Sequence, residues 1–280
     1  MKSTDFELIS YDISELNFNE HNYTELINFK IFKYNNHTEY RFYEKPILKN
    51  VEKSIEKTKY YLIDGKQINV DTGEIRSDKS IEHSKKSSMN RTINNIYELA
   101  FANNWEYFFT FTFSPDKVDR YNYEECYKKL SKFLNNLKNK KCPELKYLVV
   151  PEQHKDGAWH FHALILGISF DMLVDSGHKV GNYTIYNFPC YRLGFSSVTL
   201  ITDTNRVSNY ITKYITKELC STISKHRYLA SKNLNRAVVE EHYLPLEQYE
   251  STIVDKLTLS SYVKEVKIEN AGQKITYIHT

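Results

Sequence analysis

The feature that most constrains this chain is the stretch Lys146 to Gly167, which carries His160 and His162 one residue apart. Successive side chains of a β-strand point to opposite faces, so both imidazoles share one face, about 7 Å apart. The apolar flanks, Tyr147 to Pro151 and Ala163 to Leu166, predict two adjacent buried strands. The stretch therefore predicts a β-hairpin that presents two imidazoles on its second strand.

The turn between these strands decides what lies opposite the histidines. If the loop has three residues and closes with Gly157 in the left-handed region, Glu152 lies across from His160 on the same face. If Asp156 and Gly157 form a two-residue turn, Gln153 takes that place. We favour the first register, because two neutral imidazoles and a carboxylate make a better divalent-cation site than two imidazoles and an amide. Taken alone, the motif fits equally well two polar side chains on a half-exposed strand.

Composition describes a globular protein without a global nucleic-acid signature. The 280 residues are 41% hydrophobic, enough for a sizeable core in one large domain or two smaller ones. Lys and Arg number 38 against 35 Asp and Glu, so any basic surface must be local. The 23 Tyr and 15 Phe residues fit an aromatic core better than a stacking platform for bases, although both uses are known.

The cysteines and the N-terminus indicate the compartment. Cys126, Cys142, Cys190 and Cys220 are widely spaced, which favours reduced thiols over a zinc knuckle or a disulfide framework. The N-terminus lacks an apolar signal core, and no apolar run is long enough to span a bilayer. We expect a protein of the host cytoplasm with no membrane partner.

The chain divides by pattern into three regions. They are a β-rich N-terminal region at 1–88 that ends in an exposed linker from Ser77 to Ser88, a central domain at 89–220, and a C-terminal extension at 221–280. In the central domain the pattern predicts helices at 90–103, 123–141 and 202–218, strands at 106–114 and 195–201, and an irregular excursion at 168–195. The lysine-rich face of the second helix is typical of a solvated surface.

The third predicted helix carries a tandem Tyr-Ile-Thr-Lys repeat. Tyr210, Lys213, Tyr214 and Lys217 form one stripe on it, with two phenols one turn apart and a lysine after each. Such an arrangement suits nucleophilic attack on phosphorus, because a tyrosine of ordinary pKa near 10 needs a nearby cation to react as phenolate. An amphipathic helix that shows Tyr and Lys to solvent is the competing interpretation.

Three motifs occur in an order and spacing that resemble the HUH endonucleases. They are the Thr- and Phe-rich strand FFTFTF at 108–113, Glu152 with His160-Phe161-His162, and the Tyr210 to Lys217 helix. Over residues 90–219 the chain is similar to rolling-circle replication initiators (Rep proteins) of plasmids and single-stranded-DNA phages, in their two-tyrosine branch. The resemblance implies an α+β HUH endonuclease fold, a central antiparallel sheet flanked by helices of ferredoxin-like or RRM-like type, which agrees with the predicted order of elements.

The resemblance also implies an activity and a cofactor. It implies metal-dependent, site-specific nicking and rejoining of single-stranded DNA through a 5′-phosphotyrosine intermediate. Mg²⁺ or Mn²⁺ would be held by His160, His162 and Glu152, with Gln153 and His154 as alternatives for the third ligand. The partner would be single-stranded origin DNA, and a host helicase or polymerase is a further candidate, because the chain has no phosphate-binding loop of the helicase type.

The same resemblance assigns roles on the helix. Tyr210 or Tyr214 would attack the phosphate and the other would perform the closing transfer, while Lys213 and Lys217 would stabilise phosphate charge or exchange the phenolic proton. A transposase or relaxase would share this chemistry. Two alternatives outside the class are a non-catalytic single-strand-binding module and a metal-dependent hydrolase that activates water. The oligomeric state is left open.

Overall fold

The computed structural model describes residues 24–34, 37–50, 60–63, 66–202, 211, 227–268 and 272–280. The chain forms two compact units, each described here by itself. The first comprises Met1–Phe32, Thr38–Lys59 and Val239–Thr280, and the second comprises Lys33–His37 and Tyr60–Val238. Both contain antiparallel sheets and helices, so the predicted α+β class is confirmed.

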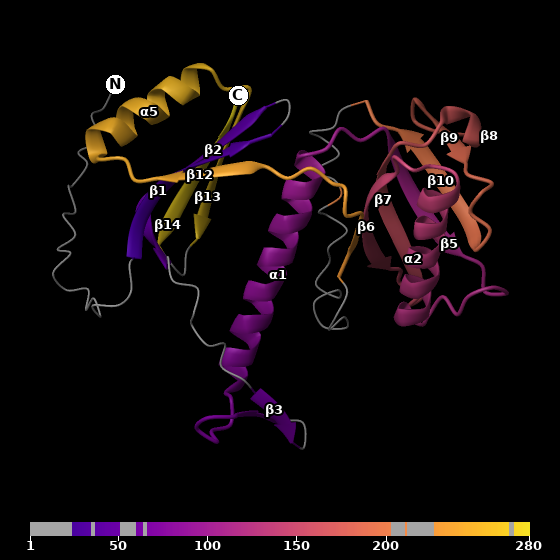
Figure 1. Ribbon diagram of the computed structural model, residues 1–280, viewed down its shortest axis with the longest axis horizontal. Helices are drawn as coiled ribbons and strands as arrows, with labels where there is room; N and C mark the ends of the chain where they lie inside the picture. The colour runs from indigo at the N-terminus through magenta and orange to yellow at the C-terminus, as the bar shows by residue number, and fades with distance from the viewer. Residues whose placement is uncertain are drawn as a thin grey trace. The chain divides into compact units, whose positions relative to one another are not determined.

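The second unit is built on a seven-stranded antiparallel sheet (Figure 1). Its order across the sheet is β11 (Leu229–Ala230), β6 (Lys146–Gln153), β7 (Trp159–Leu166), β5 (Tyr107–Phe113), β10 (Gly194–Leu200), β9 (Tyr183–Asn187) and β8 (Val174–Val180). The unit also contains α1 (Asp78–Phe101), α2 (Tyr123–Lys140), the short helix η2 (Phe170–Met172) and a hairpin of β3 (Tyr60–Ile63) and β4 (Lys66–Asn69). The predicted strands at 106–114 and 195–201 and the helix at 123–141 are confirmed.

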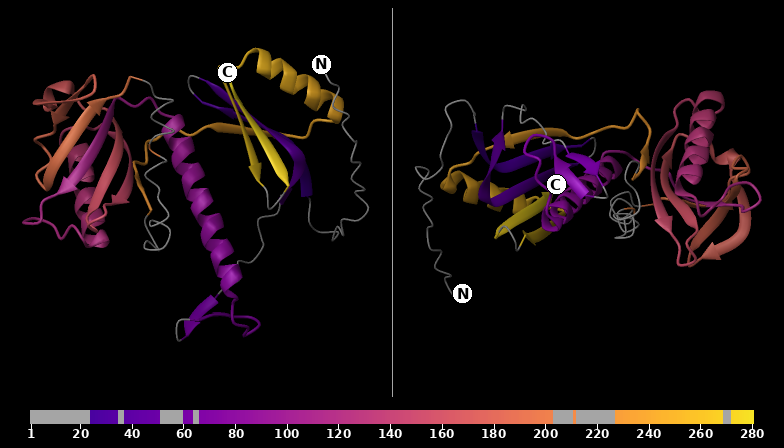
Figure 2. Two further views of the ribbon diagram at one scale, coloured as in Figure 1. Left: turned by 180° about the vertical axis from the view of Figure 1, so that it is seen from behind. Right: turned by 90° about the horizontal axis from the view of Figure 1, so that it is seen from below.

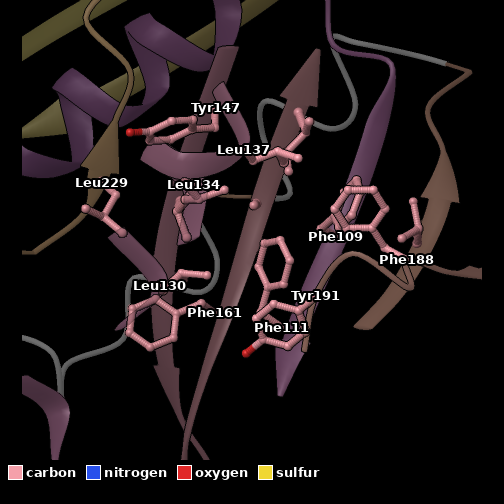
Figure 3. Close-up of a cluster of buried hydrophobic side chains, with 14 of the residues drawn as sticks. Phe109, Phe111, Leu130, Leu134, Leu137, Tyr147, Phe161, Phe188, Tyr191 and Leu229 are labelled. Atoms are coloured by element: carbon pink, nitrogen blue, oxygen red, sulfur yellow. The ribbon is translucent and has the colours of Figure 1, made fainter. Parts of the chain in front are cut away.

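One face of this sheet forms the main core with α2. Alternate residues of β5 are buried, and Phe109, Phe111 and Phe113 point to this side. The helix begins at its N-cap Asn122, whose side chain accepts a hydrogen bond from the backbone of Glu125. Figure 3 shows the resulting cluster, in which leucines of α2 meet aromatic rings from the strands. The expectation that the aromatic residues serve a core holds for these side chains.

The opposite face carries a smaller apolar cluster beside polar side chains. Leu148 and Val150 of β6 and Leu164 of β7 are fully buried there. The covering residues come from the last turns of α1 and from Ile211, which is helical and itself fully buried. This face is apolar at one end of β6 and β7, and the histidines lie at the other end.

The β6–β7 hairpin adopts the three-residue register that the sequence analysis favours. The backbone N–H of His154 donates to Ala158 O and that of Gly157 to His154 O, which closes the loop. Gly157 has a φ of 87°, a conformation that costs other residues about 1–2 kcal/mol. As a result Glu152 pairs directly with His160.

Two expectations about local structure are wrong. The segment Ser77 to Ser88 is no linker, because Ser77 caps α1 by accepting a bond from the Ser80 backbone and the helix runs on from Asp78. The excursion at 168–195 is not irregular, since it contains the β8–β9 hairpin at the edge of the sheet. In both segments most side chains are exposed, so no apolar periodicity marks the element.

The first unit joins segments from both ends of the chain. Its five-stranded sheet has the order β12 (Val238–His242), β1 (Thr24–Lys33), β2 (Thr38–Asn50), β14 (Gln273–His279) and β13 (Tyr262–Ile268). Helix α5 (Leu246–Thr258) lies along one face of this sheet (Figure 2), where Tyr249 packs edge-on against Phe42. The β-rich character predicted for the N-terminal region therefore extends to strands contributed by residues 238–280.

Candidate active site

Strand pairing brings the predicted ligands together on the sheet face opposite α2. Across β6, β7 and β5, one row contains Glu152, His160 and Thr112. The next row on the same face contains Val150, His162 and Thr110. Directly paired residues of antiparallel strands have Cβ atoms about 5 Å apart, so the two rows form one cluster.

Both ring nitrogens of His162 have partners. Its Nε2 lies 2.7 Å from Oε2 of Glu152, and its Nδ1 lies 3.1 Å from Oγ1 of Thr110. The His162 side chain is 8% exposed and that of Glu152 is 28% exposed. The ring is thus held in place by one carboxylate and one hydroxyl, with the carboxylate open to solvent on one side.

His160 is held by a hydroxyl and by a second imidazole. Its Nδ1 lies 3.1 Å from Oγ1 of Thr112. The ring of His154 stacks on it, with ring centroids 3.6 Å apart and an angle of 2° between the planes. Nε2 of His154 is also 3.9 Å from Oε2 of Glu152. Three imidazoles therefore lie around a single carboxylate.

Burial keeps both predicted histidine ligands neutral. Burial, together with the neighbouring His154 and His162, lowers the pKa of His160 to about 4, and the Glu152 carboxylate opposes this shift. Burial likewise lowers the pKa of His162, against the hydrogen bond and the charge of Glu152. At neutral pH the two rings therefore carry a free lone pair each, the form in which imidazole binds metals.

The donor types suit a divalent cation, but the side chains do not converge on one position. Two neutral imidazoles and a carboxylate are ligands typical of such sites. Within residues 66–202 and the other described segments, no three His, Cys, Asp or Glu side chains are arranged to hold one metal ion. One reason is visible in the hydrogen bonds, because His162 Nε2 is occupied by the Glu152 carboxylate. Ligation by this set requires that contact to open.

The alternatives for the third ligand differ in position. Gln153 pairs with Trp159, and its Nε2 donates to the carbonyl of Gly157 at 3.0 Å, so it does not lie opposite His160. His154 does lie on the histidine face, stacked on His160.

The predicted nucleophiles fall outside the described residues. Tyr210, Lys213, Tyr214 and Lys217 belong to that part of the chain, and their positions are not given. Their neighbour Ile211 is described, and it packs in the same buried cluster as Val150, the residue paired with His162.

Sequence reasoning missed the link between the threonines and the histidines. The alternation of FFTFTF places Thr110 and Thr112 on one face of β5. The partner of β5 is β7, a strand that follows it only after α2 and β6. The local pattern thus gives the face of the threonines, while their pairing with His162 and His160 arises from the sheet topology.

Comparison with known proteins gives one match. Residues 106–219 match a family model of replication-associated proteins, the ORF2 family. The matched range begins just before β5 and contains all the predicted ligands together with the Tyr210 to Lys217 repeat. No curated protein and no solved structure matches the chain. None of the described helices combines the length and the apolar character that a membrane span requires.

Proposed function

We propose that this chain is a rolling-circle replication initiator that nicks and rejoins single-stranded origin DNA through a 5′-phosphotyrosine intermediate. The observation that carries the proposal is the cluster of Glu152, His160 and His162 on one sheet face, inside the segment that matches replication-associated proteins. The match supports a role in DNA replication and DNA as the partner. The chemistry is inferred from the residues.

The ligand chemistry supports a metal-assisted reaction. Mg²⁺ or Mn²⁺ held by His160, His162 and Glu152 would supply a Lewis acid for the scissile phosphate. The chain's own contribution is to keep both imidazoles neutral by burial and to orient them. When Nδ1–H of each ring donates to its threonine, the lone pair is left on Nε2, so Thr110 and Thr112 are suited to select the ligating tautomer.

The tyrosine step follows from the sequence and from Ile211. Ile211 is helical and buried on the histidine face, and Tyr210 precedes it directly in the chain. We infer that the phenol of Tyr210 or Tyr214 attacks phosphorus. A tyrosyl O–P bond forms, the P–O3′ bond breaks, and the departing 3′ oxygen receives a proton and becomes a hydroxyl. Lys213 and Lys217 would accept the phenolic proton or balance the phosphate charge.

The hairpin register favours an initiator over a relaxase. Relaxases of this class commonly have a third histidine in place of the carboxylate. Here Glu152 pairs with His160 and bonds His162, so the carboxylate takes the place that discriminates between them.

The test is formation of a covalent adduct. The protein is incubated with labelled single-stranded origin DNA from its own replicon and Mn²⁺, and label that migrates with denatured protein is measured. We expect an adduct that disappears with EDTA and in His160→Ala, and that is abolished by Tyr210→Phe or Tyr214→Phe, whichever removes the first nucleophile. Cleaved DNA without attached protein would instead indicate a hydrolase, and binding without cleavage a single-strand-binding module.

A further inference from the structure

The row of residues at the active site continues onto a neighbouring strand. Across the β5–β10 pair, Phe195 lies directly opposite Thr112, the residue whose hydroxyl contacts His160. Its neighbours in the strand point the other way: Ser196 bonds the backbone of Phe188, and Val198 is buried in the core beneath α2. The Phe195 ring is therefore on the histidine face, two strands and about 10 Å from His160.

This ring differs from the other phenylalanines of the sheet. Phe109, Phe111, Phe161 and Phe188 are at most 2% exposed, whereas Phe195 is 75% exposed. Single exposed apolar residues are common on protein surfaces, so exposure alone has no meaning. The position beside the candidate active site gives it one, because the free face of an aromatic ring there is available to a substrate.

The backbone at the start of β10 is fixed against β5. A Cβ added to Gly194 would lie 2.1 Å from the carbonyl oxygen of Thr112 and 2.6 Å from the nitrogen of Ser114. The backbone N–H of Ser114 also donates to Leu193 O at 2.9 Å. Phe195 is thus presented from a rigid segment, as a preorganised binding surface requires.

Two cations lie at the same end of these strands. Lys117, in the loop after β5, donates from Nζ to the backbone carbonyl of Arg192 at 2.8 Å. Both side chains are exposed, and Arg192 precedes Phe195 by three residues. An aromatic face with adjacent cations is the combination that binds single-stranded nucleic acid, with the ring stacking on a base and the cations contacting phosphates.

We propose that Phe195 is a stacking platform for a base of the single-stranded DNA next to the scissile phosphate, with Lys117 and Arg192 contacting its backbone. This inference rests on the proposed function and names the part of the sheet that positions the strand. Stacking on one ring is tolerant of sequence, so Phe195 contributes affinity and placement while recognition of the origin lies elsewhere.

The test is DNA binding without metal, so that no strand is cleaved. Fluorescence anisotropy of a labelled mixed-sequence single-stranded oligonucleotide is measured in EDTA with the wild-type chain, Phe195→Ala, Phe195→Trp and Phe170→Ala. Phe170 is the matched control, since it is 50% exposed in the same unit but packs against Tyr186, which is on the side of the α2 core. We expect Phe195→Ala to weaken binding about 5- to 150-fold, the range for loss of one base–aromatic stack, with Phe195→Trp and Phe170→Ala near wild type.

A second readout locates the base. The fluorescence of 2-aminopurine, placed at successive positions of the oligonucleotide, is quenched by stacking, and we expect one quenched position that is lost in Phe195→Ala. Wild-type affinity in Phe195→Ala, or an equal loss in Phe170→Ala, would overturn the inference while leaving adduct formation as the test of the proposed function. Dependence of binding on Phe195 without any adduct would support the platform and contradict the nickase.

Discussion

Oε2 of Glu152 lies 2.7 Å from Nε2 of His162, across the β6–β7 pair and one row from the residue with which Glu152 is in register. The contact joins the predicted carboxylate ligand to the more buried of the two predicted histidine ligands. It stabilises the protonated form of that histidine while burial opposes protonation. The same atoms are those that a divalent cation would need.

Replacing the carboxylate tests this relationship. In Glu152→Gln the pKa of His162 should fall further below its ordinary value, because the charge and the hydrogen bond of Glu152 raise it. The measurement is an NMR titration of the imidazole protons. Glu106→Gln is the control, since that carboxylate accepts a bond from the Gly167 backbone in the same unit. An unchanged His162 pKa in Glu152→Gln would show that the contact does not form in solution.

The hydroxyl behind His160 should tune metal affinity. Thr112→Val keeps the shape of the side chain but removes the partner of His160 Nδ1. Loss of such a supporting bond typically weakens metal binding about 10- to 100-fold, which calorimetry with Mn²⁺ would measure. Thr199→Val is the matched change, because Thr199 pairs with Phe108 on the same face. Equal affinities in the two variants would exclude a role for Thr112 in orienting the ring.

Much of the site could be predicted because its signals are local. The alternation of His160 and His162 gives their shared face, and Gly157 with its left-handed turn gives the register that places Glu152 opposite them. The β5–β7 pairing could not be predicted, since it joins strands separated by a helix and another strand. The same holds for β2 and β14, which pair although Tyr43 and Ile275 lie far apart in the sequence.

The missed elements have a different cause. The first half of α1 is mostly exposed, and its stability depends on the Ser77 cap and on contacts such as the bond from Arg76 Nη1 to Gln67 at 3.0 Å. The β8–β9 hairpin is also largely exposed, and its register shifts between Asp175 and His178. Patterns of buried and exposed residues reveal only elements that contribute a face to a core.

Close approach of β10 to β5 predicts a steep cost for a methyl group. Gly194→Ala should lower the free energy of unfolding by about 3 kcal/mol, because the new Cβ would meet backbone atoms of β5. Gly177→Ala is the comparison, since a Cβ there has open space and its φ of 75° costs about 1 kcal/mol. Urea unfolding measures both. Gly194→Ala as stable as Gly177→Ala would contradict the tight pairing.

Stability should fall in mild acid because of His160. Its pKa is about 4 in the folded chain against an ordinary 6.5, so protonation favours unfolding. The contribution is complete above pH 6.5 and is lost as the pH falls from there through about 4. Urea unfolding at a series of pH values should show a shallower loss in His160→Gln, whose side chain does not titrate. Equal slopes in both proteins would place His160 in a solvated environment.

The most direct measurement identifies the amino acid that carries the DNA. Trypsin cleaves after Arg206, Lys213 and Lys217, so Tyr210 and Tyr214 fall in separate peptides, 207–213 and 214–217. After reaction with single-stranded origin DNA and Mn²⁺, nuclease and trypsin digestion, mass spectrometry should find a nucleotide phosphate on one of these two peptides, and none with EDTA or with His160→Ala. Cleaved DNA with both peptides unmodified would contradict the tyrosine mechanism.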